Sequence, residues 1–145
     1  MTVAALVDTN VLVYQFDPRF AHKQARAIEL LRDGIAANSI RVPYQALLEF
    51  VAATTRPLGP RGPSLLNAEE ARREVEDMLA QFVVLYPDED VLRTAIRGAA
   101  TYGLSWFDAS IWAYAERYNL DTIWSEDFDH TRLYGRVRVQ DPFAT

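Results

Sequence analysis

The chain alternates between short continuous apolar runs and longer stretches in which apolar residues recur every three or four positions. The continuous runs predict strands at residues 3–7, 40–42, 82–86, 122–124 and 137–139. The periodic stretches predict helices at residues 21–37, 43–55, 68–81, 88–102 and 106–118, with short helical turns at residues 10–16 and 126–131. Because strand and helix alternate, we expect an α/β protein, a three-layer α/β/α arrangement with a mainly parallel central sheet.

Polar residues, glycine and proline mark the boundaries of these elements. Asn67 and Ser105 stand where helix N-caps are preferred, and Gly103 is typical of a helix end. Residues 56–64 hold three prolines and two glycines, which predicts a loop. A length of 145 residues with 50% hydrophobic content predicts a single domain, residues 1–145.

The composition restricts any metal site to oxygen ligands. The chain has no cysteine, and its two histidines, His22 and His130, lie far apart in the sequence. This excludes disulfides and thiolate sites, and it argues against a zinc cage. The N-terminal segment lacks the basic part of a secretory signal, and no apolar run approaches the length of a membrane span. We therefore expect a cytoplasmic protein.

The charged residues leave nucleic-acid binding open. The net charge of -5 argues against a broadly basic surface, but the basic residues are 14 arginines and one lysine, Lys23. Arginine suits bidentate contact with phosphate, so a local contact with nucleic acid is compatible with the acidic total. A biased genomic composition explains the same ratio of arginine to lysine.

Two acidic residues lie at the carboxyl ends of expected strands. Asp8 closes the first apolar run, and Asp127 follows the strand at residues 122–124. In open parallel sheets ligands bind at the carboxyl ends of the strands, so both acids are candidates for a functional site. Each also has a structural explanation. Asp8 is a possible N-cap, as is Asn10, and Asp127 suits the first turn of a helix capped by Ser125.

Two further acids lie on expected helices. Asp108 shares a face with the most apolar residues of its helix, which would turn its charge toward the core or a cleft. A capping box with Ser105 explains the same position. Glu49 lies opposite the apolar stripe of its helix, where a solvated surface glutamate is expected. Its alanine neighbours are small enough for another layer or a cleft wall to approach.

Convergence of these acids would favour a metal ion. Carboxylates that crowd together repel one another, and their pKa values rise unless a cation neutralises them. Without cysteine or suitable histidine ligands, the hard cations Mg²⁺ or Mn²⁺ are favoured. Such an ion can activate water and steady a phosphodiester during in-line attack.

Four short motifs stand in a fixed order along the chain. They are Val7-Asp8-Thr9-Asn10-Val11-Leu12, Ala46-Leu47-Leu48-Glu49-Phe50, Trp106-Phe107-Asp108-Ala109-Ser110-Ile111 and Trp124-Ser125-Glu126-Asp127. Together they resemble the PIN domain family, in particular the VapC-type toxins of prokaryotic toxin-antitoxin modules, and the resemblance spans nearly the whole chain. The chain departs from the family in the longer loop at residues 56–64 and in Asp141-Pro142-Phe143, where relatives often have Asn-Pro-Phe.

The resemblance implies an acidic catalytic site with two direct metal ligands, Asp8 and Asp108. Glu126 and Asp129 lie close to Asp127 in the sequence and leave open which of these three acids faces the metal. The resemblance further implies a Mg²⁺-dependent endoribonuclease that leaves a 5′-phosphate and a 3′-hydroxyl. A VapB-type antitoxin, whose C-terminal segment enters the active-site groove, and a homodimer are also implied. The full set of implied site residues is Asp8, Glu49, Asp108 and Asp127, with Asn10 and Ser125 as polar support.

Other functions are compatible with parts of this pattern. A PIN nuclease of RNA processing would share the acidic residues without being a toxin. An aspartate-nucleophile phosphatase or a receiver-like domain also starts with Asp after the first strand. Those proteins usually need a second acid two positions on and a helping lysine, whereas this chain has Asn10 and only Lys23. For a nuclease, the cleaved sequence would depend on groove shape and on arginines such as Arg19, Arg56, Arg61 or Arg97.

Overall fold

A single mixed sheet runs through the centre of the computed structural model, which describes residues 3–144. Its strands have the order β3-β2-β1-β4-β6-β5, and all neighbours are parallel except the antiparallel pair β5 and β6. The expected mainly parallel sheet is therefore confirmed. The strands are β1 (Ala5–Val7), β2 (Ile40–Pro43), β3 (Val83–Leu85), β4 (Thr122–Trp124), β5 (Leu133–Tyr134) and β6 (Val137–Gln140).

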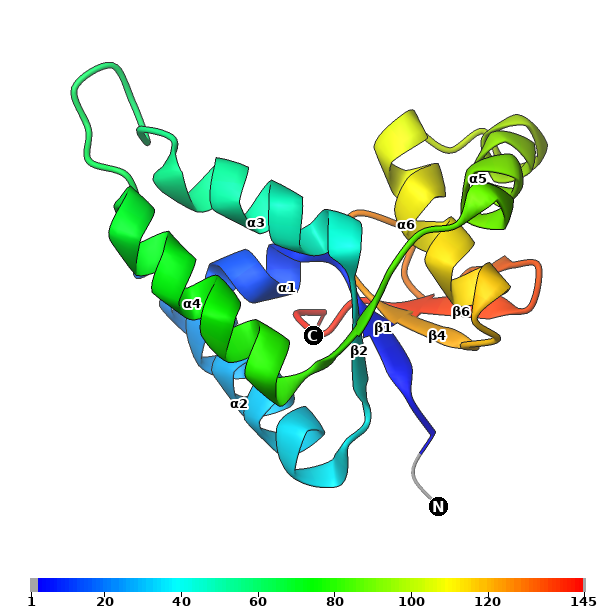
Figure 1. Ribbon diagram of the computed structural model, residues 1–145, viewed down its shortest axis with the longest axis horizontal. Helices are drawn as coiled ribbons and strands as arrows, with labels where there is room; N and C mark the ends of the chain where they lie inside the picture. Colours follow the sequence, from blue (N-terminus) through cyan, green and yellow to red (C-terminus); the bar gives the residue numbers. More distant parts are fainter. Residues whose placement is uncertain (1–2, 145) are drawn as a thin grey trace.

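Helices cover both faces of this sheet and complete the three-layer α/β/α fold (Figure 1). The helices α1 to α4 lie on one side of the sheet, and α5 and α6 lie on the other. The loop that joins α3 to α4 extends away from the sheet. The helices are α1 (Thr9–Tyr14), α2 (Ala21–Ala37), α3 (Tyr44–Thr55), α4 (Ala68–Gln81), α5 (Glu89–Tyr102) and α6 (Trp106–Arg117).

The helix boundaries follow from local hydrogen bonding. Asn67 accepts the amide of Glu70, and the Glu70 side chain accepts the amide of Asn67, so α4 begins with a complete capping box. Ser105 caps α6. Gly103 follows α5 with a φ of 66°, a left-handed conformation that glycine adopts without steric cost.

Three details differ from the sequence-based expectation. Residues 126–131 form bends and turns instead of a helical turn, although the Ser125 hydroxyl accepts the Asp127 amide as an N-cap residue does. The two-residue strand β5 was not predicted; it pairs with β6 across a tight turn at Gly135, which has a φ of 66°. Pro43 ends β2 and is the N-cap of α3, whereas a place inside the first helical turn was expected.

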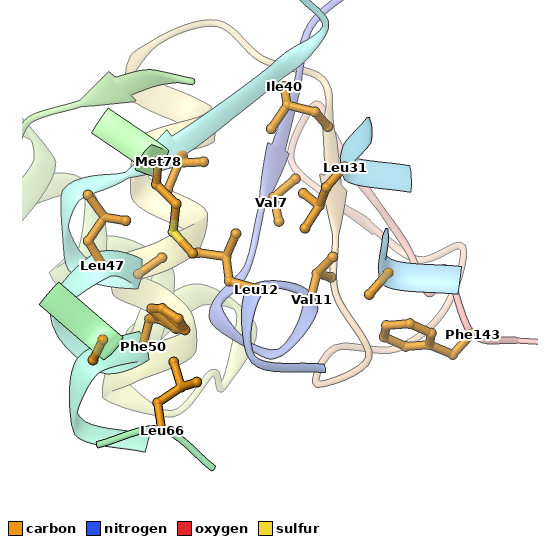
Figure 2. Packing of buried hydrophobic residues seen from close by; sticks show 14 residues of the cluster. Val7, Val11, Leu12, Leu31, Ile40, Leu47, Phe50, Leu66, Met78 and Phe143 are labelled. Atoms are coloured by element: carbon orange, nitrogen blue, oxygen red, sulfur yellow. The ribbon is translucent and has the colours of Figure 1, made fainter. Parts of the chain in front are cut away.

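The sheet separates two buried apolar clusters. One lies beneath α1 to α4, and the other lies between the sheet and the helices α5 and α6. Figure 2 shows the first cluster, in which Val11 and Leu12 of the short helix α1 lie at the centre, with Leu12 on the side of Phe50 and Met78. Both α1 side chains are fully buried, so this helix is fixed by packing despite its length. Because α1 is fixed, the position of its N-cap, Asp8, which directly follows β1, is fixed as well.

The helices between residues 3 and 144 include no candidate for a membrane span, because none is both long and apolar enough.

Candidate metal centre

The strand order creates a switch point between β1 and β4. From β1 the chain crosses to β2 on one side, and β4 later adds to the other side of β1. The carboxyl ends of β1 and β4 are held in register, since the Asp8 amide donates to the carbonyl of Trp124 at 3.0 Å. In α/β sheets such a point leaves a crevice outside the strand ends. Asp8 and Ser125, the first residues after the two strands, lie at this crevice.

Asp8 is a buried carboxylate with two hydrogen-bond donors. It is 3% exposed. One oxygen accepts the Thr9 amide at 2.7 Å as the N-cap of α1, and the other accepts the Ser125 hydroxyl at 2.7 Å. Burial raises the pKa of Asp8 to about 7, with a smaller contribution from Asp127 and Asp108, although the two hydrogen bonds act in the opposite direction. Asp8 therefore does cap α1, as predicted, and it also has a raised pKa.

Asp108 reaches the same place from the first turn of α6. Its amide donates to the Ser105 hydroxyl at 3.1 Å, which is half of the predicted capping box. The reciprocal bond, in which the Ser105 amide would donate to the Asp108 carboxylate, is absent among the described residues, so the carboxylate is left to face the crevice. Partial burial raises the pKa of Asp108, and the nearby charges of Asp127 and Glu49 raise it further.

Asp127, Asn10 and Ser125 form a polar network around these acids. The Ser125 hydroxyl is fully buried; it accepts the Asn10 side-chain amide at 3.2 Å and the Asp127 backbone amide at 3.0 Å. Asn10 lies within α1 and is not a cap; it also donates to the Asp127 carboxylate at 3.1 Å. The network fixes Asp127, which belongs to a segment without regular structure, relative to the ends of β1 and β4.

Three of the four predicted acids come close enough to share one cation. One oxygen each from Asp8, Asp108 and Asp127 lies within 4.8 Å of the others. The buried Asn10 Oδ1 has no hydrogen-bond partner among the described residues, and a buried acceptor of this kind is costly unless something donates to it or binds it. An all-oxygen donor set with this much negative charge fits a hard divalent cation.

Glu49 lies beside this group and is not part of it. Its carboxylate accepts the Thr9 hydroxyl at 2.7 Å, and its side chain lines the same cleft as the three aspartates. The alanines next to it, Ala52 and Ala53, line the cleft as well, so the small neighbours did signal a cleft wall. The buried stripe of α3 is narrow: Leu47 and Phe50 are buried, whereas the neighbouring Val51 is 38% exposed.

A family model for the PIN domain matches residues 5–136. This chain belongs to the PIN domain family. The match confirms the resemblance that the four sequence motifs carry. Comparison with curated proteins gives no match.

Solved structures similar to this PIN domain cover most of its length. A toxin-antitoxin complex from Klebsiella pneumoniae is 18% identical, covers 96% of this chain and 98% of that chain, and has a TM-score of 0.67. DNA-bound VapBC from Salmonella typhimurium is 15% identical, with coverage of 97% and 99% and a TM-score of 0.69. VapC20 from Mycobacterium tuberculosis, described as a sarcin-ricin loop cleaving toxin, is 18% identical, with coverage of 87% and 92% and a TM-score of 0.63. At these identities the likeness shows a shared fold.

Two acids that the sequence left in competition with Asp127 have other partners in this PIN domain. Glu126 accepts a hydrogen bond from the Tyr14 hydroxyl at 2.5 Å and forms an ion pair with Lys23 at 2.7 Å. Asp129 pairs with Arg132. The clamp formed by Glu126, Tyr14 and Lys23 ties the segment after β4 to α1 and α2. No local sequence pattern indicates the clamp, because Glu126 lies more than a hundred positions from Tyr14 and Lys23.

The acidic group opens into a cleft of about 470 Å³. Aromatic and cationic side chains contribute to its wall, notably Phe20, Phe107, Arg19 and Arg56. Phe107 is 65% exposed although it directly precedes Asp108. The PIN domain thus combines a carboxylate group at the base of a cleft with side chains around it that suit nucleotide bases and phosphates.

Proposed function

We propose that this PIN domain is a Mg²⁺-dependent endoribonuclease. The observation that carries the proposal is the convergence of Asp8, Asp108 and Asp127 within 4.8 Å at the switch point of the sheet. Structural needs account for the Asp8 cap, but they do not account for three carboxylates at one place, where the pKa values of Asp8 and Asp108 are raised by burial and by neighbouring acids. A divalent cation removes this cost, and its affinity for oxygen ligands favours Mg²⁺ or Mn²⁺.

The residues of the cleft would have distinct roles in phosphodiester hydrolysis. Asp8, Asp108 and Asp127 would hold the cation, and Ser125 and Asn10 would keep Asp8 and Asp127 in place through their hydrogen bonds. The bound ion would lower the pKa of a water molecule and offset charge on the phosphate. Glu49, oriented by Thr9, is a carboxylate in the same cleft that can accept a proton from water. Attack on phosphorus by water with departure of the 3′-oxygen leaves a 5′-phosphate and a 3′-hydroxyl.

The test compares purified protein, free of any antitoxin, with the variant Asp108→Asn. The proposal predicts Mg²⁺-dependent cleavage of RNA by the wild type, no cleavage in EDTA, and a loss of at least about a hundredfold in the variant. Asp77→Asn makes the same chemical change on the exposed surface of α4 and should cleave like the wild type. Full activity of Asp108→Asn would refute the assignment.

We infer further that the nuclease is the toxin of a type II toxin-antitoxin pair with a VapB-type antitoxin. Similar structures include a toxin-antitoxin complex and VapBC bound to DNA, and this chain covers nearly their whole length. The discriminating observations are genetic. A toxin predicts a small neighbouring gene for a DNA-binding protein whose coexpression relieves growth arrest. A nuclease of RNA processing predicts neither the neighbouring gene nor the arrest.

An exposed apolar surface supports the proposal that the protein functions as a homodimer. Leu48 of α3 and Leu92 of α5 are each 55% exposed, and Trp106 of α6 is 48% exposed; they line one groove that adjoins Glu49 and Phe107. Contiguous apolar surface of this kind is typical of interfaces between proteins. Leu92→Glu should convert a dimer to a monomer in light scattering, whereas Leu79→Glu, on an exposed site of α4, should not.

The phosphatase and receiver alternatives lack a suitable lysine. Lys23 is bound to Glu126 at 2.7 Å and to the Tyr14 hydroxyl at 3.3 Å. Its ammonium also lies 4.9 Å from the centroid of the Tyr14 ring. The lysine is therefore occupied by the clamp described above, and Asn10 stands where those proteins carry a second acid. Labelling of an aspartate by a phosphoryl donor would reverse this conclusion.

A further inference from the structure

An arginine in the wall of the acidic cleft is held in a fixed orientation. Asp17 is 3% exposed, and its carboxylate accepts Arg19 Nε at 2.9 Å and Arg19 Nη2 at 2.8 Å. The Arg19 backbone amide donates to the same carboxylate at 3.1 Å. The Arg19 side chain is 50% exposed and lines the cleft. This bidentate contact uses two of the five guanidinium hydrogens, so the remaining donors lie at the cleft in a fixed plane.

Stability alone gives little reason for this arrangement. An ion pair with an exposed partner contributes little to folding, and burial of a carboxylate carries a desolvation cost. The contact with Arg19 lowers the pKa of Asp17, which keeps the buried acid charged. The guanidinium carbon also lies 5.4 Å from the centroid of the Phe20 ring. The contacts with Asp17 and Phe20 thus fix the Arg19 side chain, which would otherwise sample many rotamers. We therefore ascribe the burial of Asp17 to the orientation of Arg19.

The net charge of the cleft means that a nucleic-acid backbone can bind there only with the help of a cationic side chain. Five acids and two arginines line it, so its wall carries a net negative charge that repels a nucleic-acid backbone even after one divalent cation has bound. Of the four arginines that sequence analysis considered for RNA contact, Arg19 and Arg56 lie at this cleft, whereas Arg97 lies on α5 beside other cavities. The charged residues of the cleft are Asp8, Asp17, Glu49, Asp108, Asp127, Arg19 and Arg56.

We propose that Arg19, aimed by the buried Asp17, binds an RNA backbone phosphate next to the scissile bond. The inference rests on the proposed ribonuclease function and adds a binding residue and a positioning residue to it. With a cation bound, the carboxylate group would hold the scissile phosphate, and the guanidinium would bind a neighbouring phosphate from the wall of the cleft. The RNA is thereby held at two points.

The first test replaces Arg19 by alanine and uses Arg72→Ala on α4 as the matched control, since Arg72 is also exposed and also makes a bidentate contact with a carboxylate, that of Glu69. Steady-state cleavage of a short RNA in Mg²⁺ should show a KM about tenfold higher for Arg19→Ala, with kcat within about twofold of the wild type. RNA binding in Ca²⁺, measured by fluorescence anisotropy, should also depend less on salt: the magnitude of the slope of log binding constant against log salt concentration should decrease by about 0.7. Arg72→Ala should change neither the KM nor the salt dependence. An unchanged KM and salt slope in Arg19→Ala would overturn the inference.

The second test separates orientation from charge through Asp17→Asn. This variant removes a negative charge from the cleft, so a purely electrostatic role for Arg19 predicts tighter RNA binding. Loss of the bidentate contact instead predicts weaker binding, and tighter binding would overturn the positioning role of Asp17. Urea unfolding confirms that each variant is folded, and Arg19→Lys, which keeps the charge without the fork, should fall between the wild type and Arg19→Ala. If the wild type cleaves no RNA, the proposed function fails, and the anisotropy alone decides on Arg19.

Discussion

Replacing Asp8 by asparagine should stabilise the metal-free protein while it abolishes the response to metal. Burial raises the pKa of this carboxyl from 3.8 to about 7, and each pKa unit corresponds to about 1.4 kcal/mol. Ionised Asp8 therefore costs the folded state up to about 4 kcal/mol above pH 7. Because the hydrogen bond with Ser125 is disturbed in the variant, at a cost of about 1 kcal/mol, the net gain in unfolding free energy is about 3 kcal/mol at pH 8.

The dependence on pH has a defined sign. A carboxyl whose pKa is raised by folding contributes stability that is present below the unfolded pKa near 4 and is lost as the pH rises through 7. Urea unfolding in EDTA, followed by tryptophan fluorescence, should show that ionisation of Asp8 lowers the unfolding free energy of the wild type by about 3 kcal/mol between pH 5 and pH 8. Asp8→Asn should lack this loss, whereas Asp77→Asn should keep it.

Saturating Mg²⁺ at pH 8 supplies the second half of this test. It should raise the unfolding free energy of the wild type, because the ion binds the folded state and neutralises Asp8. The Asp8→Asn variant should show little change. If the wild type and Asp8→Asn have the same dependence on pH in EDTA, Asp8 does not carry a buried charge in the folded protein and the electrostatic reasoning is wrong.

Three further predictions concern the metal, the clamp and the core. Mn²⁺ affinity measured by calorimetry should fall about tenfold per pH unit below 7, since protons then compete for Asp8; a constant affinity between pH 8 and pH 5.5 would contradict this. Glu126→Gln should weaken Mn²⁺ binding about tenfold by releasing the Asp127 segment, and Lys23→Met, which leaves the Glu126 charge, should act in the same direction. Gly98→Ala should destabilise the fold by about 1–3 kcal/mol, because its Cβ would lie 2.4 Å from the Trp112 ring, whereas Gly59→Ala meets no atom within 4 Å and should unfold like the wild type in urea.

Local sequence signals predicted the parts of the site that lie at element boundaries. Asp8 and Asp127 follow strands, and the parallel arrangement of those strands brings their ends together. Asp108 was visible because a charge interrupted the apolar face of a helix. Glu49 had only its small neighbours as a signal from the residues themselves, and the family motif carried its prediction.

Contacts between distant segments could not be predicted from periodicity. The clamp joins Lys23 to Glu126 across 103 positions, and no local pattern links them. The Asp17 to Arg19 contact spans only two positions, but oppositely charged residues around a proline also occur in solvated turns, and only the burial of Asp17 distinguishes the two cases. The strand β5 has two residues, which is too short for an alternating pattern to appear.

A crystal structure of the protein soaked with Mn²⁺ at pH 8 would locate the bound cation. An anomalous peak should lie between the carboxylates of Asp8, Asp108 and Asp127, and this peak should be lost in Asp108→Asn. A peak at Glu126 or Glu49 without contact to Asp8, or a peak that persists in the variant, would show that these three aspartates do not share a cation.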